Sequence, residues 1–428
     1  MSLSANNPAR TSWLYVNKNS DFPIQNIPFG VFLTKDDIIT IGTRIGDTAI
    51  DLGALHQLGY FEGIPLTDDI FLQDTLNDFI ADGRKTWRLV RNRIAEIFDS
   101  KNETLKNNVK HKEIVLFRLD EIEMKIPVQV GDYTDFYASK EHATNVGTMF
   151  RGADNALMPN WLHLPVGYHG RSSSIVTTHI PIHRPQGQTM PVGAKNPVFG
   201  PSKQVDFELE MAFITTDAND LGEPIPIEEA EDYIFGLVLF NDLSARDIQK
   251  WEYVPLGPFL GKNFASSISP WIVTLDALEP FRVDTPKQTP KPLPYLRSKG
   301  KKSFDIQLEV ALKPQDAKEQ VVARSNFKYM YWNMAQQLAH HTINGCPVNS
   351  GDMMGSGTIS GPTEDSFGSM LELTWKGEKP IKMKDGSERK FIEDYDTIIM
   401  RGHCENDDVR IGFGQVKTQI LPVFNQKK

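Results

Sequence analysis

The sequence predicts a mostly β protein of the α+β class. Apolar and polar residues alternate through residues 205–214, which is the period of a β-strand. Helical spacing of apolar residues is limited to two long stretches, 79–98 and 325–343. Short strand-like runs separated by turn residues recur near the start of the chain, at 31–34, 38–45 and 48–52.

Length and composition restrict the classes of function. A chain of 428 residues can form two or three domains, each with its own core. A net charge of −9 argues against nucleic acid as the main partner. The two cysteines, Cys346 and Cys404, argue against a disulfide framework and fit a reducing cytoplasm. We expect no signal peptide and no membrane span, because no apolar stretch approaches the roughly 20 residues that a bilayer requires.

The N-terminal third is predicted to be a separate unit. Its strand-like runs suggest a small meander or barrel, and the stripe from Phe79 to Phe98 suggests a helix behind it. A further β run is predicted over residues 114–126, ending at Pro127. We therefore divide the chain into residues 1–120 and 121–428.

The remainder is predicted to be rich in strands. Residues 131–170 are dense in Gly, Pro and aromatic residues, which indicates a long irregular segment of functional importance. The one convincing helix of this part should begin with Ser325 as its N-cap and end before Gly345. Strands are expected at 205–214, 234–239, 271–274, 304–312, 356–360, 370–375 and 408–421.

The polar face of the 205–214 strand carries Glu208 and Glu210 side by side. One interpretation is an ordinary solvated edge of an antiparallel sheet. The other is that a cation holds the carboxylates together, since aligned like charges repel each other. Asp135 and Asp242 lie in similarly aromatic-rich runs, and four carboxylates are the oxygen ligands that Ca²⁺ and Mg²⁺ prefer. Asp206 shares the same face, and for it we expect a solvated position.

Seven further motifs resemble the fumarylacetoacetase family. They are long and rich in Trp, Tyr, Pro and Gly, and with the segments between them the resemblance covers nearly the whole chain. They are Gly131–Tyr137, His142–Asn145, Met149–Gly152, Leu164–Arg171, Asn241–Asp247, Trp251–Lys262 and Ser356–Gly361.

The resemblance implies a fold, an assembly and a reaction. The fold is a small N-terminal SH3-like β-barrel domain followed by a larger mixed β-roll domain, and the assembly is a cytoplasmic homodimer. The reaction is hydrolysis of the carbon–carbon bond of fumarylacetoacetate, a β-diketo dicarboxylate, to fumarate and acetoacetate. This reaction is the last step of tyrosine and phenylalanine catabolism.

The resemblance also implies roles for individual residues. Four carboxylates would bind Ca²⁺ or Mg²⁺: Asp135, Glu208, Glu210 and Asp242. His142 falls at the general base and Glu372 at the carboxylate that orients it. Near the developing oxyanion and leaving group fall Arg246, Gln249 and Lys262. At substrate-contacting positions fall Tyr137, Arg151, Tyr168, Tyr253 and Thr358.

Two departures from the family pattern concern the surroundings of Asp242. Leu243 stands where a Trp is common, and Ser266 stands where a Thr lies near the metal and Lys262. Because Ser266 keeps the hydroxyl, it and Lys262 could still serve beside the metal or at a second one. We expect altered packing rather than lost chemistry.

Other interpretations remain open at this point. A related acylpyruvate hydrolase or oxaloacetate decarboxylase is the alternative within the enzymes, and a non-catalytic metal-binding protein is the more remote one. Taken alone, His142 would be a surface or capping residue, Arg246 part of a surface ion pair, and Lys262 a solvated cation. Their places in matched motifs favour the catalytic interpretation.

Overall fold

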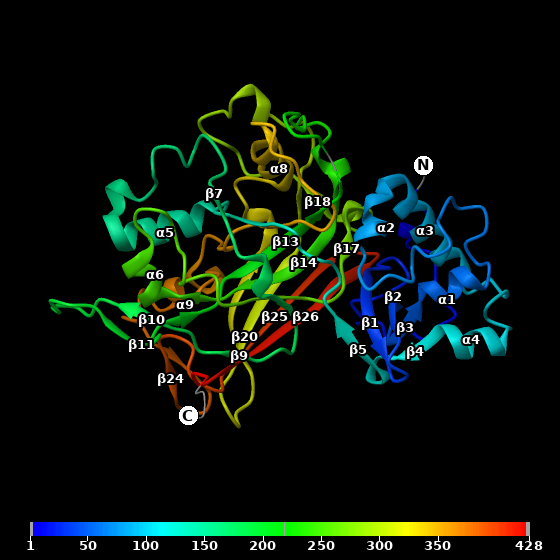
Figure 1. Cartoon of the computed structure of the whole chain (residues 1–428), viewed down its shortest axis with the longest axis horizontal. Coiled ribbons are helices and arrows are strands. Elements are labelled where there is room, and N and C mark those ends of the chain that lie inside the picture. Colours follow the sequence, from blue (N-terminus) through cyan, green and yellow to red (C-terminus); the bar gives the residue numbers. More distant parts are fainter. Residues whose placement is uncertain (1–2, 218, 425–428) are drawn as a thin grey trace.

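The computed structural model describes residues 3–217 and 219–424. Its N-terminal part, blue to cyan in Figure 1, is a five-stranded antiparallel sheet in the order β4-β3-β2-β1-β5, flanked by helices. The strands are β1 (Phe29–Thr34), β2 (Ile39–Ile45), β3 (Thr48–Asp51), β4 (Leu116–Arg118) and β5 (Ile122–Lys125). The helices are α1 (Leu52–Gln57), α2 (Asn77–Ala81), α3 (Gly83–Ile97) and α4 (Val109–Val115). The predicted meander and the helical stripe are both confirmed.

Two larger sheets form the rest of the molecule. The first has eight strands in the order β7-β6-β22-β13-β14-β16-β8, with β17 beside β14. Its members are β6 (Tyr133–Phe136), β7 (Gly167–His169), β8 (Ile175–Thr177), β13 (Leu209–Thr215), β14 (Ile234–Asp242), β16 (Ser266–Ile268), β17 (Val273–Thr274) and β22 (Met353–Gly355). The second has the order β21-β20-β25-β26-β9. Its members are β9 (Ile182–His183), β20 (Gln307–Lys313), β21 (Gln320–Asn326), β25 (Thr397–Glu405) and β26 (Arg410–Leu421).

Short ribbons and helices complete the fold. The paired strands are β10 (Gln186–Thr189) with β11 (Val198–Pro201), β12 (Val205–Asp206) with β15 (Ser244–Ala245), β18 (Arg282–Val283) with β19 (Ser303–Phe304), and β23 (Ile381–Lys382) with β24 (Glu388–Arg389). The helices are α5 (Lys140–Arg151), α6 (Arg246–Glu252), α7 (Leu275–Leu278), α8 (Met334–Thr342) and α9 (Met370–Leu373). The strand-rich α+β class is therefore confirmed.

Strand β13 is buried on both faces, which explains its place at the centre of the fold. Met211 and Phe213 pack into the core shared with the second large sheet. Ala212 and Ile214, on the opposite face, pack into a core shared with the N-terminal helices and strands. The predicted alternation thus distinguishes two buried environments rather than a buried and a solvated one.

The predicted strand 205–214 is interrupted in the structure. Strand β12 pairs with β15, whereas β13 pairs with β14 and β22, so the chain changes partners at Phe207 and Glu208. Glu208 instead forms an isolated bridge with Ser369. This break brings the segment before β13 close to the start of α9.

The helix predicted over 325–343 is shorter than expected. Ser325 lies in β21, opposite Leu308 of β20, so its backbone belongs to a sheet ladder. The N-cap is Asn333, whose side chain accepts a hydrogen bond from the amide of Gln336. The predicted C-terminus of the helix, residue 343, lies one residue from the observed one. Helix α8 stops at Thr342, and Gly345 adopts a φ of +83°.

Four further segment predictions were wrong. Residues 356–360 are irregular, because Gly357 takes a φ of +77° directly after β22. Residues 370–375 begin with helix α9, since the Ser369 hydroxyl caps it by accepting from the amide of Glu372. The irregular segment 131–170 contains helix α5, capped by Ser139. The β run 114–126 is divided by the end of α4 and by a 3₁₀ turn at Leu119–Glu121.

Within residues 3–217 and 219–424, no helix has the length and apolar character needed to cross a membrane.

Candidate active site and metal centre

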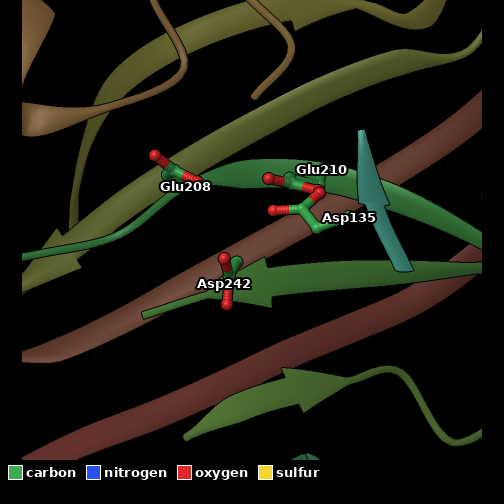
Figure 2. A group of neighbouring side chains, drawn as sticks. All are labelled: Asp135, Glu208, Glu210 and Asp242. Carbon is green, nitrogen blue, oxygen red and sulfur yellow. The ribbon is translucent and has the colours of Figure 1, made fainter. Parts of the chain in front are cut away.

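Four buried carboxylates converge at one edge of the core (Figure 2). They belong to Asp135 on β6, Glu208 just before β13, Glu210 on β13 and Asp242 at the end of β14. One oxygen from each lies within 4.8 Å of the others. Such a set of oxygen donors from three strands has the composition of a site for a hard divalent cation.

The pleat of the large sheet explains this convergence. Strand β22 runs between β6 and β13, and β14 follows β13 on its far side. Glu210 lies two residues before Ala212, and Asp242 two residues after Phe240, so each carboxylate shares a face with an apolar residue that packs against the N-terminal part. The same sheet face is therefore apolar at one end and acidic at the other.

Gly355 of β22 leaves room for the carboxylates. A Cβ atom at this position would lie 2.9 Å from Oδ1 of Asp135 and 3.0 Å from Oε2 of Glu210. Real Cβ atoms essentially never show the first separation, and the second is tighter than most, so a larger residue would displace an acid. Glu210 Oε2 is held by the amide of Gly357 at 3.0 Å.

The cluster is electrostatically unbalanced without a cation. Burial raises the pKa of Asp135 well above its usual range, and the neighbouring Asp242 raises it further. Burial, then Asp135 and Glu208, likewise raise the pKa of Glu210. In the part of the chain that the structure describes, Oδ1 of Asp135 and Oε1 of Glu210 are buried without a hydrogen-bond partner. Buried acceptors without donors are costly, and a bound cation would satisfy both of them.

Two buried cations stand beside the acids. Lys262 Nζ contacts Glu208 and lies 2.6 Å from Oδ2 of Asp242. Arg246 Nη2 lies 2.8 Å from Oε1 of Glu208. Burial would raise the pKa of Glu208, but Lys262 and Arg246 outweigh it and hold that pKa below the usual range. For Lys262, the attraction of Asp242 and Glu208 outweighs burial and raises its pKa, so it stays charged.

A histidine–carboxylate pair lies on the other side of the site. His142 Nδ1 lies 2.6 Å from Oε2 of Glu372, and both side chains are buried. Because the carboxylate only accepts, Nδ1 carries a proton, and in a neutral ring Nε2 then keeps its lone pair. Burial alone would raise the pKa of Glu372, but His142 and its other donors lower it, so it stays ionised.

One pocket of about 560 Å³ connects these groups. It is lined by two of the four clustered carboxylates, by the histidine expected as the base, by all three groups expected near the oxyanion, and by all five expected to contact substrate. These residues are Asp135, Glu208, His142, Arg246, Gln249, Lys262, Tyr137, Arg151, Tyr168, Tyr253 and Thr358. Glu210, Asp242 and Glu372 do not line this pocket, but Asp242 contacts Lys262 and Glu372 contacts His142.

Two tyrosines of the pocket, Tyr137 and Tyr168, have raised pKa values and remain protonated. Burial, followed by Glu372, raises the pKa of Tyr137, whose ring also packs edge-on against His142 with centroids 5.1 Å apart. Burial, followed by Asp242, raises the pKa of Tyr168 well above its usual range. The Tyr168 hydroxyl donates to Asp242 Oδ2 at 3.3 Å. Both phenols can therefore act as neutral hydrogen-bond donors.

The two departures near Asp242 have different outcomes. The Ser266 hydroxyl donates to Oδ1 of Asp242 at 2.8 Å, so it contacts a candidate metal ligand. Leu243 is fully buried within the apolar core. The solvated position expected for Asp206 is wrong, because its carboxylate is fully buried and lies 2.9 Å from Nε of Arg246.

Three polar residues that support Glu372 were missed in the sequence. Asn145 donates to Oε1 at 2.9 Å, while Ser360 and Ser369 donate to Oε2 at 2.9 and 2.8 Å. Asn145 follows His142 by three residues, a spacing that indicates one helix face, but this segment was expected to be irregular. No sequence signal marks the two serines, which come from separate turns.

Comparisons with known proteins agree over nearly the whole chain. The family model "Fumarylacetoacetase N-terminal" matches residues 25–127, and "Fumarylacetoacetate (FAA) hydrolase C-terminal" matches residues 132–421. Fumarylacetoacetase of Dictyostelium discoideum is 53% identical, with 96% of this chain and 98% of that protein covered. The Homo sapiens and Arabidopsis thaliana fumarylacetoacetases are 51% and 50% identical, each over 96% of this chain and over 99% and 98% of their own lengths.

A solved structure supports the fold independently. The fumarylacetoacetate hydrolase of Exiguobacterium antarcticum superimposes with a TM-score of 0.52, covering 92% of this chain and 99% of that one at 18% identity. At that identity the likeness concerns the fold alone. The family models and the near full-length relatives together show that this chain belongs to the fumarylacetoacetase family.

Proposed function

We propose that this chain hydrolyses the carbon–carbon bond of fumarylacetoacetate to give fumarate and acetoacetate. The named activity of its relatives, at 50–53% identity over nearly their whole length, supports this substrate. The observation that carries the chemistry is the common pocket. It joins a carboxylate-backed histidine, an acidic cluster and a buried lysine within one cavity of about 560 Å³.

A divalent, oxygen-preferring cation, Ca²⁺ or Mg²⁺, is proposed at the four carboxylates. The fit rests on the unpartnered oxygens of Asp135 and Glu210 and on the raised pKa values of both groups. Asp135, Glu208, Glu210 and Asp242 would hold the ion. When bound, the cation would supply Lewis-acid polarisation of the diketone oxygens and neutralise negative charge.

His142 is proposed as the general base. Its Nε2 would take a proton from a water molecule, which then attacks the carbonyl carbon that becomes a carboxyl carbon of fumarate. Glu372 fixes the tautomer and stabilises the imidazolium that forms. Asn145, Ser360 and Ser369 hold this carboxylate in one orientation by donating to it.

Lys262, Arg246 and Gln249 are proposed to stabilise the negative charge of the reaction. Attack produces a tetrahedral oxyanion, and cleavage of the C–C bond leaves its electron pair on the acetoacetate fragment as an enolate. Both species need donors fixed in advance. Lys262 is fixed by Asp242, and Gln249 Oε1 accepts from Nη1 of Arg246 at 3.3 Å. A proton then completes acetoacetate.

Arg151 and the pocket hydroxyls are proposed to recognise the substrate. The Arg151 guanidinium donates to the backbone carbonyls of Asn155 and Ala156, which holds it at the pocket wall. A guanidinium suits the terminal carboxylate, because it can offer two parallel donors. Hydroxyl groups line the pocket on Tyr137, Tyr168, Tyr253 and Thr358, and Thr358 Oγ1 is buried without a partner among the described residues.

The proposed function is tested by adding fumarylacetoacetate to the purified protein with Ca²⁺ or Mg²⁺. The ultraviolet absorbance of the diketone should fall as it is consumed, and His142→Ala should abolish this while retaining cation binding. A parallel panel with an acylpyruvate and oxaloacetate separates the related activities. If the protein consumed only those compounds, fumarylacetoacetate would be the wrong substrate.

Three further assignments are also proposals. A homodimer is proposed from the family resemblance, and light scattering tests it. A reducing cytoplasm fits the two cysteines, which are both free in the structure. The division into residues 1–120 and 121–428 is proposed for the domains, although β5, at 122–125, pairs with β1 of the N-terminal sheet.

A further inference from the structure

Asp206 occupies a buried position between the two halves of the site. Its side chain is 0% exposed. Oδ1 accepts from the amide of Met370 at 2.7 Å, and Oδ2 accepts from the amide of Leu371 at 3.0 Å and from Nε of Arg246 at 2.9 Å. One carboxylate therefore satisfies two backbone donors of α9 and one guanidinium donor.

Each of these partners also holds a group that is proposed to act in the site. Helix α9 carries Glu372, the next residue after Leu371, and Glu372 accepts from His142. Arg246 extends beyond Asp206 to Oε1 of Glu208, 2.8 Å from its Nη2. Asp206 thus connects the histidine half of the site to the acidic half without lining the pocket itself.

Helix α9 depends on such external contacts for its position. It contains four residues, too few for a helix to be stable by itself in water. Trp375 and Lys376, just after it, adopt positive φ values of +47° and +60°. The Lys376 ammonium donates to the carbonyl of Met149 on α5 at 2.8 Å, so the far end is tied to the helix that carries His142. The near end is tied by Asp206.

We propose that Asp206 is a positioning residue for the hydrolysis, an inference that rests on the proposed function. It fixes the start of α9, and therefore the position of Glu372 against His142. Through its contact with Arg246, it also fixes the position of α9 relative to the Arg246–Glu208 pair. Asp206 touches no substrate. Its removal lowers turnover because Glu372 and Arg246 lose their common anchor.

The variant Asp206→Asn tests this placement. Asparagine has nearly the same volume, but its amide group would face an N–H donor where the carboxylate now accepts. The matched control is Asp396→Asn. Asp396 is 1% exposed, accepts from Arg389 Nε at 2.7 Å and Nη2 at 3.0 Å, and accepts from the amide of Glu393 at 3.0 Å. Like Asp206, it is buried and accepts from an arginine and a backbone amide, but among the described residues it has no hydrogen bond or ion pair with His142, Glu372 or their helices.

Two measurements separate positioning from general stability. We expect kcat of the Asp206→Asn protein to be at least about tenfold below that of Asp396→Asn, because a misplaced supporting group commonly costs 10- to 100-fold. We also expect loss of the low-field proton resonance of the His142 Nδ1–H, assigned by its absence in His142→Ala. This resonance reports the 2.6 Å contact with Glu372 and needs no turnover.

The inference is overturned if Asp206→Asn keeps the low-field resonance, or if its kcat lies within twofold of the Asp396→Asn value. If the asparagine variant does not fold, Asp206→Glu decides by the same two measurements, because it keeps the charge but moves the carboxylate by one methylene. A parent protein that fails to consume fumarylacetoacetate refutes the proposed function instead. The resonance still tests the placement in that case.

Discussion

Replacing Glu372 with glutamine removes the negative charge beside the proposed base, His142, and changes the volume of the side chain very little. The carboxylate accepts from His142, Asn145, Ser360 and Ser369 at 2.6 to 2.9 Å. A glutamine oxygen can take the position of Oε2 and accept from the histidine and both serines. The Asn145 amide can turn its oxygen toward the new NH₂ group. Tautomer and packing are therefore retained, while the ionic partner of the imidazolium is lost.

The magnitude follows from that loss. A hydrogen bond to a charged group contributes about 1.5–3 kcal/mol. If this stabilisation acts on the imidazolium in the transition state, kcat falls by about 10- to 150-fold. Binding of substrate does not involve Glu372 directly, so KM should change by less than about threefold.

The assay is steady-state consumption of fumarylacetoacetate followed by ultraviolet absorbance, with the cation supplied. The matched control is Glu231→Gln, which removes a half-buried acid held by Arg282 at 2.9 Å and Lys302 at 2.7 Å. This control should lose stability but keep kcat. The reasoning is refuted if Glu372→Gln folds and turns over at the parent rate, or if only its KM changes.

Two other perturbations test the acidic cluster, and a third tests the ion pair between α7 and helix α3 of the N-terminal part. Glu210→Gln should raise the melting temperature of the cation-free protein at pH 7.5, because burial and neighbouring acids raise the pKa of Glu210 and make its ionised form unfavourable. In the parent protein, a cation at 100 Kd should add roughly 2.7 kcal/mol of stability. Scanning fluorimetry should show that the variant loses this stabilisation by the cation. Gly355→Ala should weaken cation binding at least about tenfold in calorimetry, since its Cβ would lie 2.9 Å from Oδ1 of Asp135, and unchanged affinity would contradict the crowding argument. Asp276→Asn should cost about 3 kcal/mol at pH 7 in chemical denaturation, because the contacts from Arg88 outweigh burial and lower the pKa of Asp276. That stabilisation is lost as the pH falls through the lowered folded pKa, so the difference from the parent should shrink below about pH 4, and a constant difference would refute the assignment.

The sequence was most informative where a pattern is local. Strand periods and turn residues depend on neighbouring residues. The strand predicted at 205–214 is present from Leu209, and the runs predicted at 31–34, 38–45 and 48–52 correspond to β1, β2 and β3. The alternation also placed Glu208 and Glu210 on one side of the chain. Their convergence with Asp135 and Asp242 depends on strand order in a sheet assembled from distant segments. No periodicity reports that order, so the four acids were grouped by the family resemblance and not by the strand pattern.

The errors have a common physical cause, which is tertiary contact overriding local preference. Residues 370–375 are mostly apolar and were predicted to form a strand, but the Ser369 cap and the Asp206 carboxylate satisfy the amides that begin helix α9. Asp206 itself was expected in solvent, because a lone acid on a strand is usually exposed. Its partners lie 40 and 164 residues away, so nothing near it in the sequence predicted its burial.

Product analysis in a single reaction tests the central claim most directly. Fumarylacetoacetate is incubated with purified protein and Ca²⁺ or Mg²⁺, and products are identified by proton NMR with and without excess chelator. We predict equal amounts of fumarate and acetoacetate, with release stopped by the chelator and restored by added cation. Intact fumarylacetoacetate in the cation-loaded reaction, or product release that ignores the chelator, would contradict a cation-dependent hydrolysis at this site.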